Sequence, residues 1–410
     1  MIPRLLKWLL LASVTIVLGV LVAVSVLQQP IGGPGPNASD TTRIHDPAFA
    51  GPAREVSNAL EGYRAALESP SVSLAVGVQG RLVLSAARGF ADLETRVLAT
   101  PDTVYAIGSA SKPITAALTL ALWEDGVLDL DSDVREYVPD FPAKRYPITL
   151  RQLLSHQAGV RHYAFRPSLP TFSESDLDRE FASTAESLGL FASDPLRFEP
   201  DTGFEYSTYG YTLVAAAIEQ ATGQAYEEVL AARLLQPLRM TGTSIDSGPE
   251  IRSLRATDYV ASFAEAAVLP APSTNSSYKR AGGGLAATTA DLVRFGNALL
   301  GDELLGAASR AAMFTPRTLR NGQVNPQRYG LGWRIGGLVL TDEAGGEERI
   351  IPLWHHGGTR AGSTAILMIV PDYGIVVAMA ANTVGRGASG PITSIAADVA
   401  RVFIRFQSPG

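Results

Sequence analysis

The sequence predicts an α+β fold, in which both ends of the chain build one mainly antiparallel sheet that is flanked by helices, and a helical subdomain is inserted between them. Two observations lead to this prediction. Residues 71–78 alternate between large apolar and smaller residues, as a half-buried strand does, and a turn joins them to a second strand at 81–87. Close to the other end, residues 350–355, 365–370 and 375–381 are apolar runs typical of strands.

Helical patterns fill the middle of the chain and cover its ends. Residues 209–223 predict a helix that Gly223 ends, and residues 225–235 predict a second helix. Thr288 begins a capping-box pattern, which opens a helix that reaches Leu300. Further helices are expected at 53–68, 150–155, 176–190 and 392–406.

The composition narrows the classes of function. The chain has 410 residues, of which 46% are hydrophobic and 18% charged, and this suits a globular core with one membrane segment. The net charge of −6, without a basic cluster in the body, argues against a nucleic-acid partner. The absence of cysteine excludes disulfides, thiol catalysis and zinc bound by cysteine. A zinc site of His156, His162 and His355 fits no standard ligand spacing.

The N-terminal residues predict a membrane anchor. Residues 8–27 are uncharged and mostly apolar, and as a helix they are long enough to span about 30 Å of hydrocarbon. An uncleaved signal anchor is favoured over a cleaved signal, because the small residues at 23–25 lie inside the apolar run. Arg4 and Lys7 keep the N-terminus cytoplasmic. The body is therefore expected on the periplasmic or extracytoplasmic side of the inner (plasma) membrane.

Three segments follow from this organisation. Residues 1–29 are the cytoplasmic N-terminus and the transmembrane signal anchor. Residues 30–51 are rich in Pro, Gly, Ser and Asp and are expected to form a flexible linker. Residues 52–408 are the globular domain, without internal repeats, and a homo-oligomer of this domain stays open.

The clearest chemistry lies where a short strand ends at Gly108 and a helix follows. Pro113 is tolerated only in a first helical turn, so the helix begins close to Ser109, and Lys112 lies one turn later on the same face. A serine hydroxyl needs a base to become a nucleophile, and a lysine is such a base only if its pKa falls. The S-x-x-K spacing is typical of serine acyl-transfer enzymes, although an N-capping serine and a surface lysine show it as well.

Three further stretches complete the pattern. Residues 205–211 place a tyrosine just before a helix, residues 278–284 contain three glycines that let the backbone pass close to a neighbour, and residues 354–359 end a strand. Together they resemble the S-x-x-K, Y-x-N and K-T-G motifs of the penicilloyl-serine hydrolases. Over about residues 53–406 the chain is similar to the class C beta-lactamase and D-alanyl-D-alanine carboxypeptidase superfamily, and within it to the mitochondrial serine beta-lactamase-like proteins and their bacterial relatives. The resemblance is carried by residues 155–163, 206–213, 275–284 and 295–298.

The resemblance implies a beta-lactamase/transpeptidase-like fold and a covalent acyl-enzyme. Ser109 would attack a carbonyl, and Lys112 and Tyr206 together would accept and return its proton, with Lys112 as the cation that lets a phenol act as a base. The backbone N–H groups of Ser109 and Thr359 would hold the oxyanion. This chemistry needs no metal and no organic cofactor.

Departures from the motifs concern the substrate. Thr208 stands where Y-x-N has an amide, and His356, Gly357 and Gly358 stand where K-T-G grips a substrate carboxylate. Histidine is largely neutral at pH 7 and Gly357 has no hydroxyl, so efficient beta-lactam hydrolysis and D-alanyl-D-alanine trimming are not expected. Arg360 either restores a positive charge there or is solvated. The residues expected to bind substrate are Thr208, His356, Gly357, Gly358 and His162.

We therefore predict a membrane-anchored serine hydrolase that acts on a peptide or amide bond. Its partners are a small peptide or ester substrate and, through the N-terminal helix, the membrane. An esterase or weak beta-lactamase of the same fold is the first alternative, and a binding or scaffold protein without turnover is the second. The complete set of Ser109, Lys112 and Tyr206 argues against a scaffold, which has no need of all three.

Overall fold

The computed structural model describes most of the chain, with gaps. The described residues are 8, 12–20, 22, 29–30, 41–165, 173–246, 254–262, 267–341, 346, 348–385 and 390–407. Among these residues no helix is both long and apolar enough to cross a bilayer. Part of the predicted anchor and residues 31–40 of the predicted linker lie outside the described residues, so both stay predictions.

The central sheet joins the two ends of the domain, as the sequence predicts. It has eight antiparallel strands in the order β11-β12-β13-β14-β3-β4-β2, with β5 paired to β4. The two ends meet where β3 pairs with β14, at the register Ala75↔Ala378. The strands are β2 (Thr42–Ile44), β3 (Ser71–Val78), β4 (Arg81–Asp92), β5 (Val97–Leu98), β11 (Arg334–Thr341), β12 (Glu348–Arg360), β13 (Ser363–Val370) and β14 (Ile375–Ala381).

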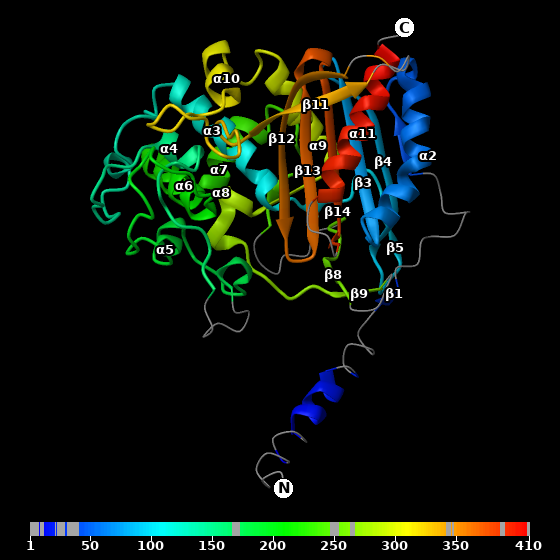
Figure 1. The fold of residues 1–410 in the computed structure, drawn as a ribbon, viewed down its shortest axis with the longest axis horizontal. Coiled ribbons are helices and arrows are strands. Elements are labelled where there is room, and N and C mark those ends of the chain that lie inside the picture. The colour runs from blue at the N-terminus through cyan, green and yellow to red at the C-terminus, as the bar shows by residue number, and fades with distance from the viewer. Residues whose placement is uncertain are drawn as a thin grey trace.

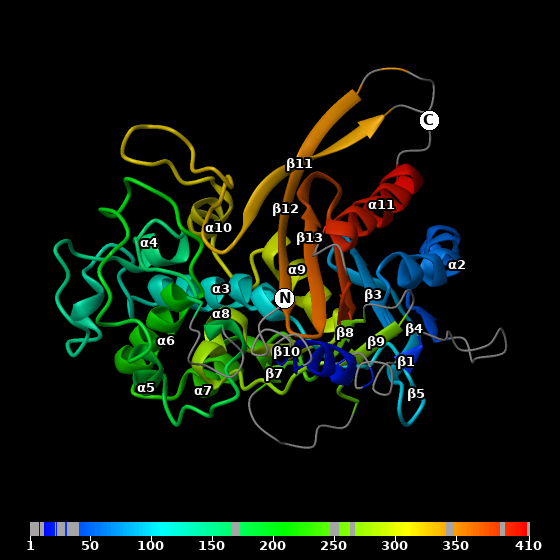
Figure 2. The ribbon, with the colours of Figure 1, turned by 60° about the horizontal axis from the view of Figure 1, so that its bottom comes forward.

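Helices cover both faces of this sheet. On one face, α2 (Ala50–Ala66) and α11 (Gly390–Gln407) share a core with the large apolar residues of β3, among them Leu74. On the opposite face, α9 (Thr289–Leu300) packs against β3 and β14, and Ala75 belongs to that second core (Figures 1 and 2). Because both faces are covered, every residue of β3 is buried, and the prediction of a half-buried strand was wrong.

The helical region forms the other part of the domain (Figure 1). Its helices are α3 (Ser111–Glu124), α4 (Leu150–Leu154), α5 (Thr184–Leu188), α6 (Thr208–Thr222), α7 (Tyr226–Leu230), the π-helix η5 (Ala231–Leu235), α8 (Arg280–Gly283) and α10 (Ala307–Phe314). Single-turn 3-10 helices are η1 (Pro47–Phe49), η2 (Gly108–Ala110), η3 (Val134–Glu136), η4 (Glu174–Asp176), η6 (Ser277–Lys279) and η7 (Pro371–Tyr373).

Local signals explain several helix ends. Thr149 forms a capping box with Gln152 at the start of α4, and Thr288 accepts a hydrogen bond from the Asp291 N–H at the start of α9. Gly223 ends α6 with a φ of 67°, in the left-handed region that glycine adopts without strain.

The helix expected at residues 176–190 is reduced to α5. The backbone before α5 is held by tertiary hydrogen bonds instead of helical ones. The Phe181 N–H donates to Ser277 Oγ at 2.8 Å, and the Leu177 carbonyl accepts from the Asn275 N–H at 2.8 Å. These contacts compete with a helix that the side-chain pattern alone favours.

The linker was predicted to extend to residue 51, and the structure differs at its end. Residues Thr42–Ile44 add strand β2 to the sheet edge, against residues 84–86 of β4. Phe49 is buried, and its ring centroid lies 6.3 Å from that of Phe403 and 5.7 Å from that of Phe406, both on α11. Apolar burial of Phe49 and pairing of β2 therefore draw this segment into the domain.

Two small sheets complete the described part of the chain. One contains β6 (Tyr105–Ala106), β10 (Leu285–Ala287) and β7 (Ser244–Ile245), and β6 leads directly into η2. The other contains β1 (Gln29–Pro30), β9 (Ala267–Pro270), β8 (Tyr259–Ala261) and β15 (Thr383–Val384).

Candidate active site

Ser109 lies in the single turn η2, between strand β6 and helix α3. Gly108 has a φ of +49°, and a Cβ atom at this position would be 2.8 Å from the backbone nitrogen and oxygen of Thr359. Only glycine fits such a turn beside another backbone. The Ser111 hydroxyl donates to the Gly108 carbonyl at 2.7 Å and holds the turn from the other side. The chain therefore presents Ser109 next to the end of β12.

Lys112 is fully buried and contacts the Ser109 hydroxyl. Its Nζ lies 3.1 Å from Ser109 Oγ, 3.1 Å from Thr208 Oγ1 and 2.5 Å from the Gly282 carbonyl oxygen. Burial first, and then the positive charges of Arg334 and Lys279, hold the pKa of Lys112 well below its usual value. A neutral amine has two N–H donors, which Gly282 and Thr208 can accept, and one lone pair, which is then left for the Ser109 proton.

Tyr206 completes the group. Lys112 Nζ lies 4.7 Å from the centroid of its ring, and Arg334 Cζ lies 5.3 Å from it. Burial raises the pKa of Tyr206 to about 12, although the Arg334 charge and interactions with Ser109 and Arg334 lower it. Tyr206 is therefore a neutral phenol at pH 7. The structure brings Ser109, Lys112 and Tyr206 together. The sequence led us to expect a positively charged Lys112 that lets Tyr206 act as a base. The pKa shifts instead favour a neutral Lys112 as the base, beside a protonated Tyr206.

The end of β12 packs directly against η2. A Cβ atom on Gly358 would be 1.8 Å from the Ile107 carbonyl oxygen and 2.7 Å from the Ala110 nitrogen, so this position holds glycine for close approach. Thr359 follows Gly358, and Thr359 and Ser109 line the same cleft. The two backbone N–H groups expected to bind the oxyanion thus belong to two segments that touch beside the nucleophile.

The cleft at Ser109 has a volume of about 420 Å³ and carries both signs of charge. Among the described residues its charged lining consists of Asp176, Lys279 and Arg360. The uncharged lining residues are Gly108, Ser109, His162, Tyr163, Ser175, Thr208, Val260, Gly282, Gly283, Thr359, Ala361, Gly362 and Val384.

Two of the predicted substrate-binding residues line the cleft. The Thr208 hydroxyl lies in contact with Lys112 Nζ, so Thr208 positions the amine as well as lining the cleft. His162 Nδ1 accepts a hydrogen bond from the Thr208 N–H at 3.2 Å. Burial, helped by the charges of Lys112, Arg161 and Lys279, lowers the pKa of His162 to about 3, so His162 is neutral at pH 7.

His356, Gly357 and Gly358 are not among the residues that line this cleft, so their role in binding substrate stays a prediction. The three residues are part of β12, and the side chain of His356 is completely buried. His356 Nδ1 lies 2.7 Å from the Gly357 carbonyl oxygen, which can only accept, so the proton is on Nδ1 and Nε2 accepts from the Tyr329 hydroxyl at 2.9 Å. Burial and the charges of Arg334 and Lys112 hold the pKa of His356 well below its usual value.

Sequence reasoning missed two residues of the site, Lys279 and Arg334. Lys279 is buried, its Nζ donates to the Ser175 carbonyl at 2.7 Å, and burial lowers its pKa to about 7. Its place in the stretch 278–284 was a usable signal. His156 lies under Tyr206, with the two ring centroids 4.3 Å apart, and Arg334 reaches Tyr206 from β11. No motif in the sequence marks Arg334.

Arg360 belongs to the cleft wall and is not solvated. Its side chain is 9% exposed and forms an ion pair with Asp246, and its Nη2 donates to Thr274 Oγ1 at 2.9 Å. Arg255 shares Asp246 and also pairs with Asp258 at 2.8 Å. The charge of Arg360 is thus already balanced by carboxylates within the fold.

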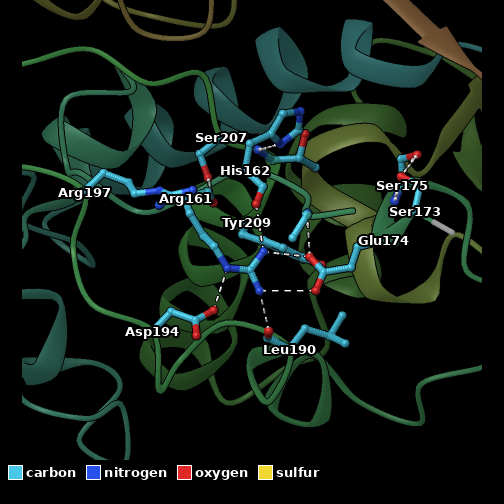
Figure 3. A network of polar contacts seen from close by, with 12 residues as sticks. Arg161, His162, Ser173, Glu174, Ser175, Leu190, Asp194, Arg197, Ser207 and Tyr209 are labelled. Carbon is cyan, nitrogen blue, oxygen red and sulfur yellow. Dashed lines mark hydrogen bonds and ion pairs between the residues drawn. The ribbon is translucent and has the colours of Figure 1, made fainter. Parts of the chain in front are cut away.

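Ion pairs and hydrogen bonds form a network around Arg161 (Figure 3). The Arg161 guanidinium contacts Glu174 at 2.6 Å and Asp194 at 2.5 Å, and it donates to the Leu190 carbonyl at 2.8 Å. The Arg161 carbonyl accepts from the Ser207 hydroxyl at 2.7 Å, and Ser207 follows Tyr206 directly. The network therefore fixes the backbone that carries Tyr206 and His162.

The fold and this constellation define a class of enzyme. A serine at a helix N-terminus, in contact with a buried lysine one turn later and with a phenol from a distant segment, is the arrangement of S-x-x-K serine hydrolases.

Comparison with known proteins gives the family. Residues 56–401 match the family described as Beta-lactamase, and the chain belongs to this family. The chain is 30% identical over 384 residues to the mitochondrial serine beta-lactamase-like protein LACTB of Homo sapiens, which covers 74% of this chain and 69% of that protein. The protein is a serine hydrolase with the beta-lactamase fold.

Solved structures agree on the fold. The D-amino acid amidase of Ochrobactrum anthropi, in complex with L-phenylalanine amide, superposes with a TM-score of 0.70 and 24% identity, over 86% of this chain and all of that one. The octameric penicillin-binding protein homologue of Pyrococcus abyssi superposes with a TM-score of 0.68 and 23% identity, over 86% of this chain and 77% of that one.

Proposed function

We propose that the protein hydrolyses an amide or peptide bond through an acyl-enzyme on Ser109. The observation that carries this proposal is the contact of 3.1 Å between Ser109 Oγ and Lys112 Nζ, in a place where burial favours the neutral amine. A neutral lysine beside a serine hydroxyl is the base that the nucleophile needs.

The acylation step follows from the positions of the three groups. As Ser109 Oγ bonds to the carbonyl carbon, its proton passes to Lys112 Nζ, and the carbonyl oxygen becomes an oxyanion that the N–H groups of Ser109 and Thr359 are placed to stabilise. When the C–N bond breaks, the leaving amine takes the proton of Tyr206. The ammonium of Lys112 then returns a proton to Tyr206, whose ring lies 4.7 Å from Nζ.

Deacylation uses the same groups with water as the nucleophile. Lys112 accepts a proton from water as the water oxygen bonds to the acyl carbon. The bond between that carbon and Ser109 Oγ breaks, and the serine oxygen regains its proton from Tyr206, which is reprotonated by Lys112. The acid product leaves, and the enzyme returns to its starting state.

Amide cleavage ranks first because the related structures include a D-amino acid amidase and a penicillin-binding protein homologue. An esterase or weak beta-lactamase is the second candidate, and one observation favours it. His356 is buried away from the cleft and Arg360 is paired with Asp246, so the strand that carries the K-T-G position offers no free charge to a substrate carboxylate. A substrate without that carboxylate, such as a simple ester, loses no binding energy from the missing charge.

Membrane attachment is a separate part of the proposal. The apolar run at residues 8–27, with positive residues before it, supports a single-pass anchor with the catalytic domain periplasmic or extracytoplasmic. Deleting residues 1–29 should move the protein from the membrane fraction to the soluble fraction after carbonate extraction. Unchanged fractionation would contradict the anchor. A homo-oligomer stays a prediction, for which size-exclusion chromatography of the full chain is the test.

An active-site probe tests the hydrolase proposal. The full chain should react with a fluorophosphonate, with the adduct on Ser109, and Ser109→Ala should lose all labelling. Ser132→Ala, which removes an exposed serine hydroxyl, is the matched control and should label normally. A protein that folds but takes up no probe would be the non-turnover scaffold. Matched amide and ester substrates then rank the two activities.

A further inference from the structure

Arg334 is the first residue of β11 and points its guanidinium at the catalytic phenol. Its Cζ lies 5.3 Å from the centroid of the Tyr206 ring and 5.6 Å from that of Tyr329. Nη1 lies 3.4 Å from His356 Nε2, and Nε donates to Gln327 Oε1 at 3.1 Å. The Arg334 charge also lowers the pKa of Tyr206, against the effect of burial. The guanidinium is thus fixed between two aromatic rings, a histidine and an amide.

No carboxylate among the described residues forms an ion pair with Arg334. The groups that face it from the surrounding elements are neutral or positive at pH 7, because the phenols and histidines are buried and Lys112 is shifted towards the neutral amine. A half-buried arginine without a counter-ion is unusual, because its charge is not compensated within the fold. The titratable groups that its charge affects are Lys112, His156, Tyr206, Tyr211, Tyr329, His355 and His356.

We propose that Arg334 supplies, from β11, the positive charge that the site lacks at His356 on the neighbouring strand, and that it acts as a positioning residue for the proton transfers between Ser109, Lys112 and Tyr206. The proposal rests on the hydrolase function proposed above. Register supports it, because Arg334 pairs with His355 on β12, next to the position of the motif's lysine. His356 and Tyr329 contact the guanidinium.

The charge has two consequences for the proton transfers. It disfavours a second cation at Lys112 and so keeps the base neutral before attack. It also favours the phenolate that forms for a moment when Tyr206 gives its proton to the leaving group, and this phenolate disappears when the Lys112 ammonium returns a proton. Both effects depend on charge and not on the shape of the arginine.

The test compares Arg334→Lys, which keeps the charge, with Arg334→Gln, which removes it, in the full chain. The first readout is the rate of Ser109 labelling by an uncharged fluorophosphonate between pH 4 and 10. Removing Arg334 should raise the pKa of Lys112. The acid limb of the labelling profile should therefore move to higher pH by about one unit, which is at the lower end of the pKa shifts that a nearby charge causes. Arg334→Lys should keep the wild-type limb. Arg349→Gln is the control, with the same charge change on the exposed part of β12.

The second readout is the dependence on the leaving group. For acyl esters, Arg334→Gln should lower kcat for an alkyl ester at least tenfold more than for the matched nitrophenyl ester, because only the alkoxide needs the Tyr206 proton. Arg334→Lys should keep most of the wild-type ratio and so show that charge is the cause.

Three outcomes would overturn the proposal. One is an unchanged acid limb together with an unchanged leaving-group ratio in Arg334→Gln, measured on protein that melts like the wild type. Another is an equal loss in Arg334→Lys and Arg334→Gln, which indicates a structural role. The third is an effect only on KM for carboxylate-bearing substrates, which indicates a substrate contact. If the wild-type protein takes up no probe, the proposed function itself fails, and this inference fails with it.

Discussion

Arg161 and Lys112 are two buried basic side chains, and their surroundings are opposite. The Arg161 side chain is 8% exposed and touches two carboxylates, Glu174 and Asp194, which raise its pKa against the effect of burial (Figure 3). Lys112 is fully buried but contacts only uncharged partners, and the cations Arg334 and Lys279 lower its pKa further. The first side chain is locked as a cation, and the second is pushed towards the neutral amine.

The difference explains how one domain contains both a rigid support and a reactive base. A buried charge with counter-charges and hydrogen bonds is expensive to disturb and therefore holds the backbone around it. A buried amine without a counter-charge is shifted towards its neutral form. Its lone pair is then free to accept the proton of a serine hydroxyl. Removing Lys112 should thus change activity, and removing the partners of Arg161 should change stability.

The largest expected effect is the loss of activity in Lys112→Met. Without the base, the rate of fluorophosphonate labelling at Ser109 should fall by a factor of about 10³ or more, as in other cases where a general base is removed from a nucleophile. The free energy of unfolding should stay within about 1 kcal/mol of the wild type, because an apolar chain replaces a buried amine. Labelling kinetics and thermal unfolding check the two parts. Retained labelling would show that Lys112 is not the base.

A smaller effect with the opposite signature is expected for Glu174→Gln. The change leaves a buried guanidinium with one carboxylate fewer, so the free energy of unfolding should fall by about 3 kcal/mol. Asp194→Asn is the matched control and should lose only about 1 kcal/mol, because Asp194 is 31% exposed and Glu174 is 4% exposed. Urea unfolding of both variants measures the difference. Equal losses would contradict the assignment of the network as a buried support.

The smallest effect concerns pH. The pKa of His162 is lowered from 6.5 to about 3, so between these values the unfolded chain binds more protons at this residue than the folded chain. Stability should therefore fall as pH decreases from about 6.5 towards 3, by less than about 1.4 kcal/mol per pH unit for one proton. In His162→Asn this slope should become shallower between pH 6 and 4, as measured by the midpoint of thermal unfolding. A slope identical to that of the wild type would show that His162 does not titrate with folding.

The parts of the fold that the sequence predicted have local causes. The alternation at residues 71–78 and the apolar runs at 365–370 and 375–381 indicated that both chain ends form one sheet, and the caps Gly223 and Thr288 indicated helix ends. The helix expected at 176–190 failed because its backbone bonds to the distant segment at 275–277, which no local pattern reveals.

The residues of the active site likewise include some that local sequence patterns predict and others that only distant contacts place. Ser109 and Lys112 are one helical turn apart, so spacing was enough to place them together. The orientation of His356 was not available from its motif, because a strand alternates its two faces and only the packing of β12 against η2 decides which face meets the cleft. Arg334 reaches Tyr206 across the sheet edge, and a contact between residues so far apart along the chain leaves no trace in a single sequence.

The two adjacent glycines of β12, Gly357 and Gly358, differ in how well their positions tolerate a larger residue. At Gly358 an added methyl group would meet the Ile107 oxygen at 1.8 Å, whereas at Gly357 it would meet its nearest neighbours at 3.7 Å, an ordinary contact. A lineage, natural or selected in the laboratory, is therefore free to acquire a serine or threonine at 357 and regain the missing hydroxyl of the third motif by one substitution, while 358 stays invariant. Position 357 can therefore vary without disturbing the contact between β12 and η2, whereas position 358 cannot.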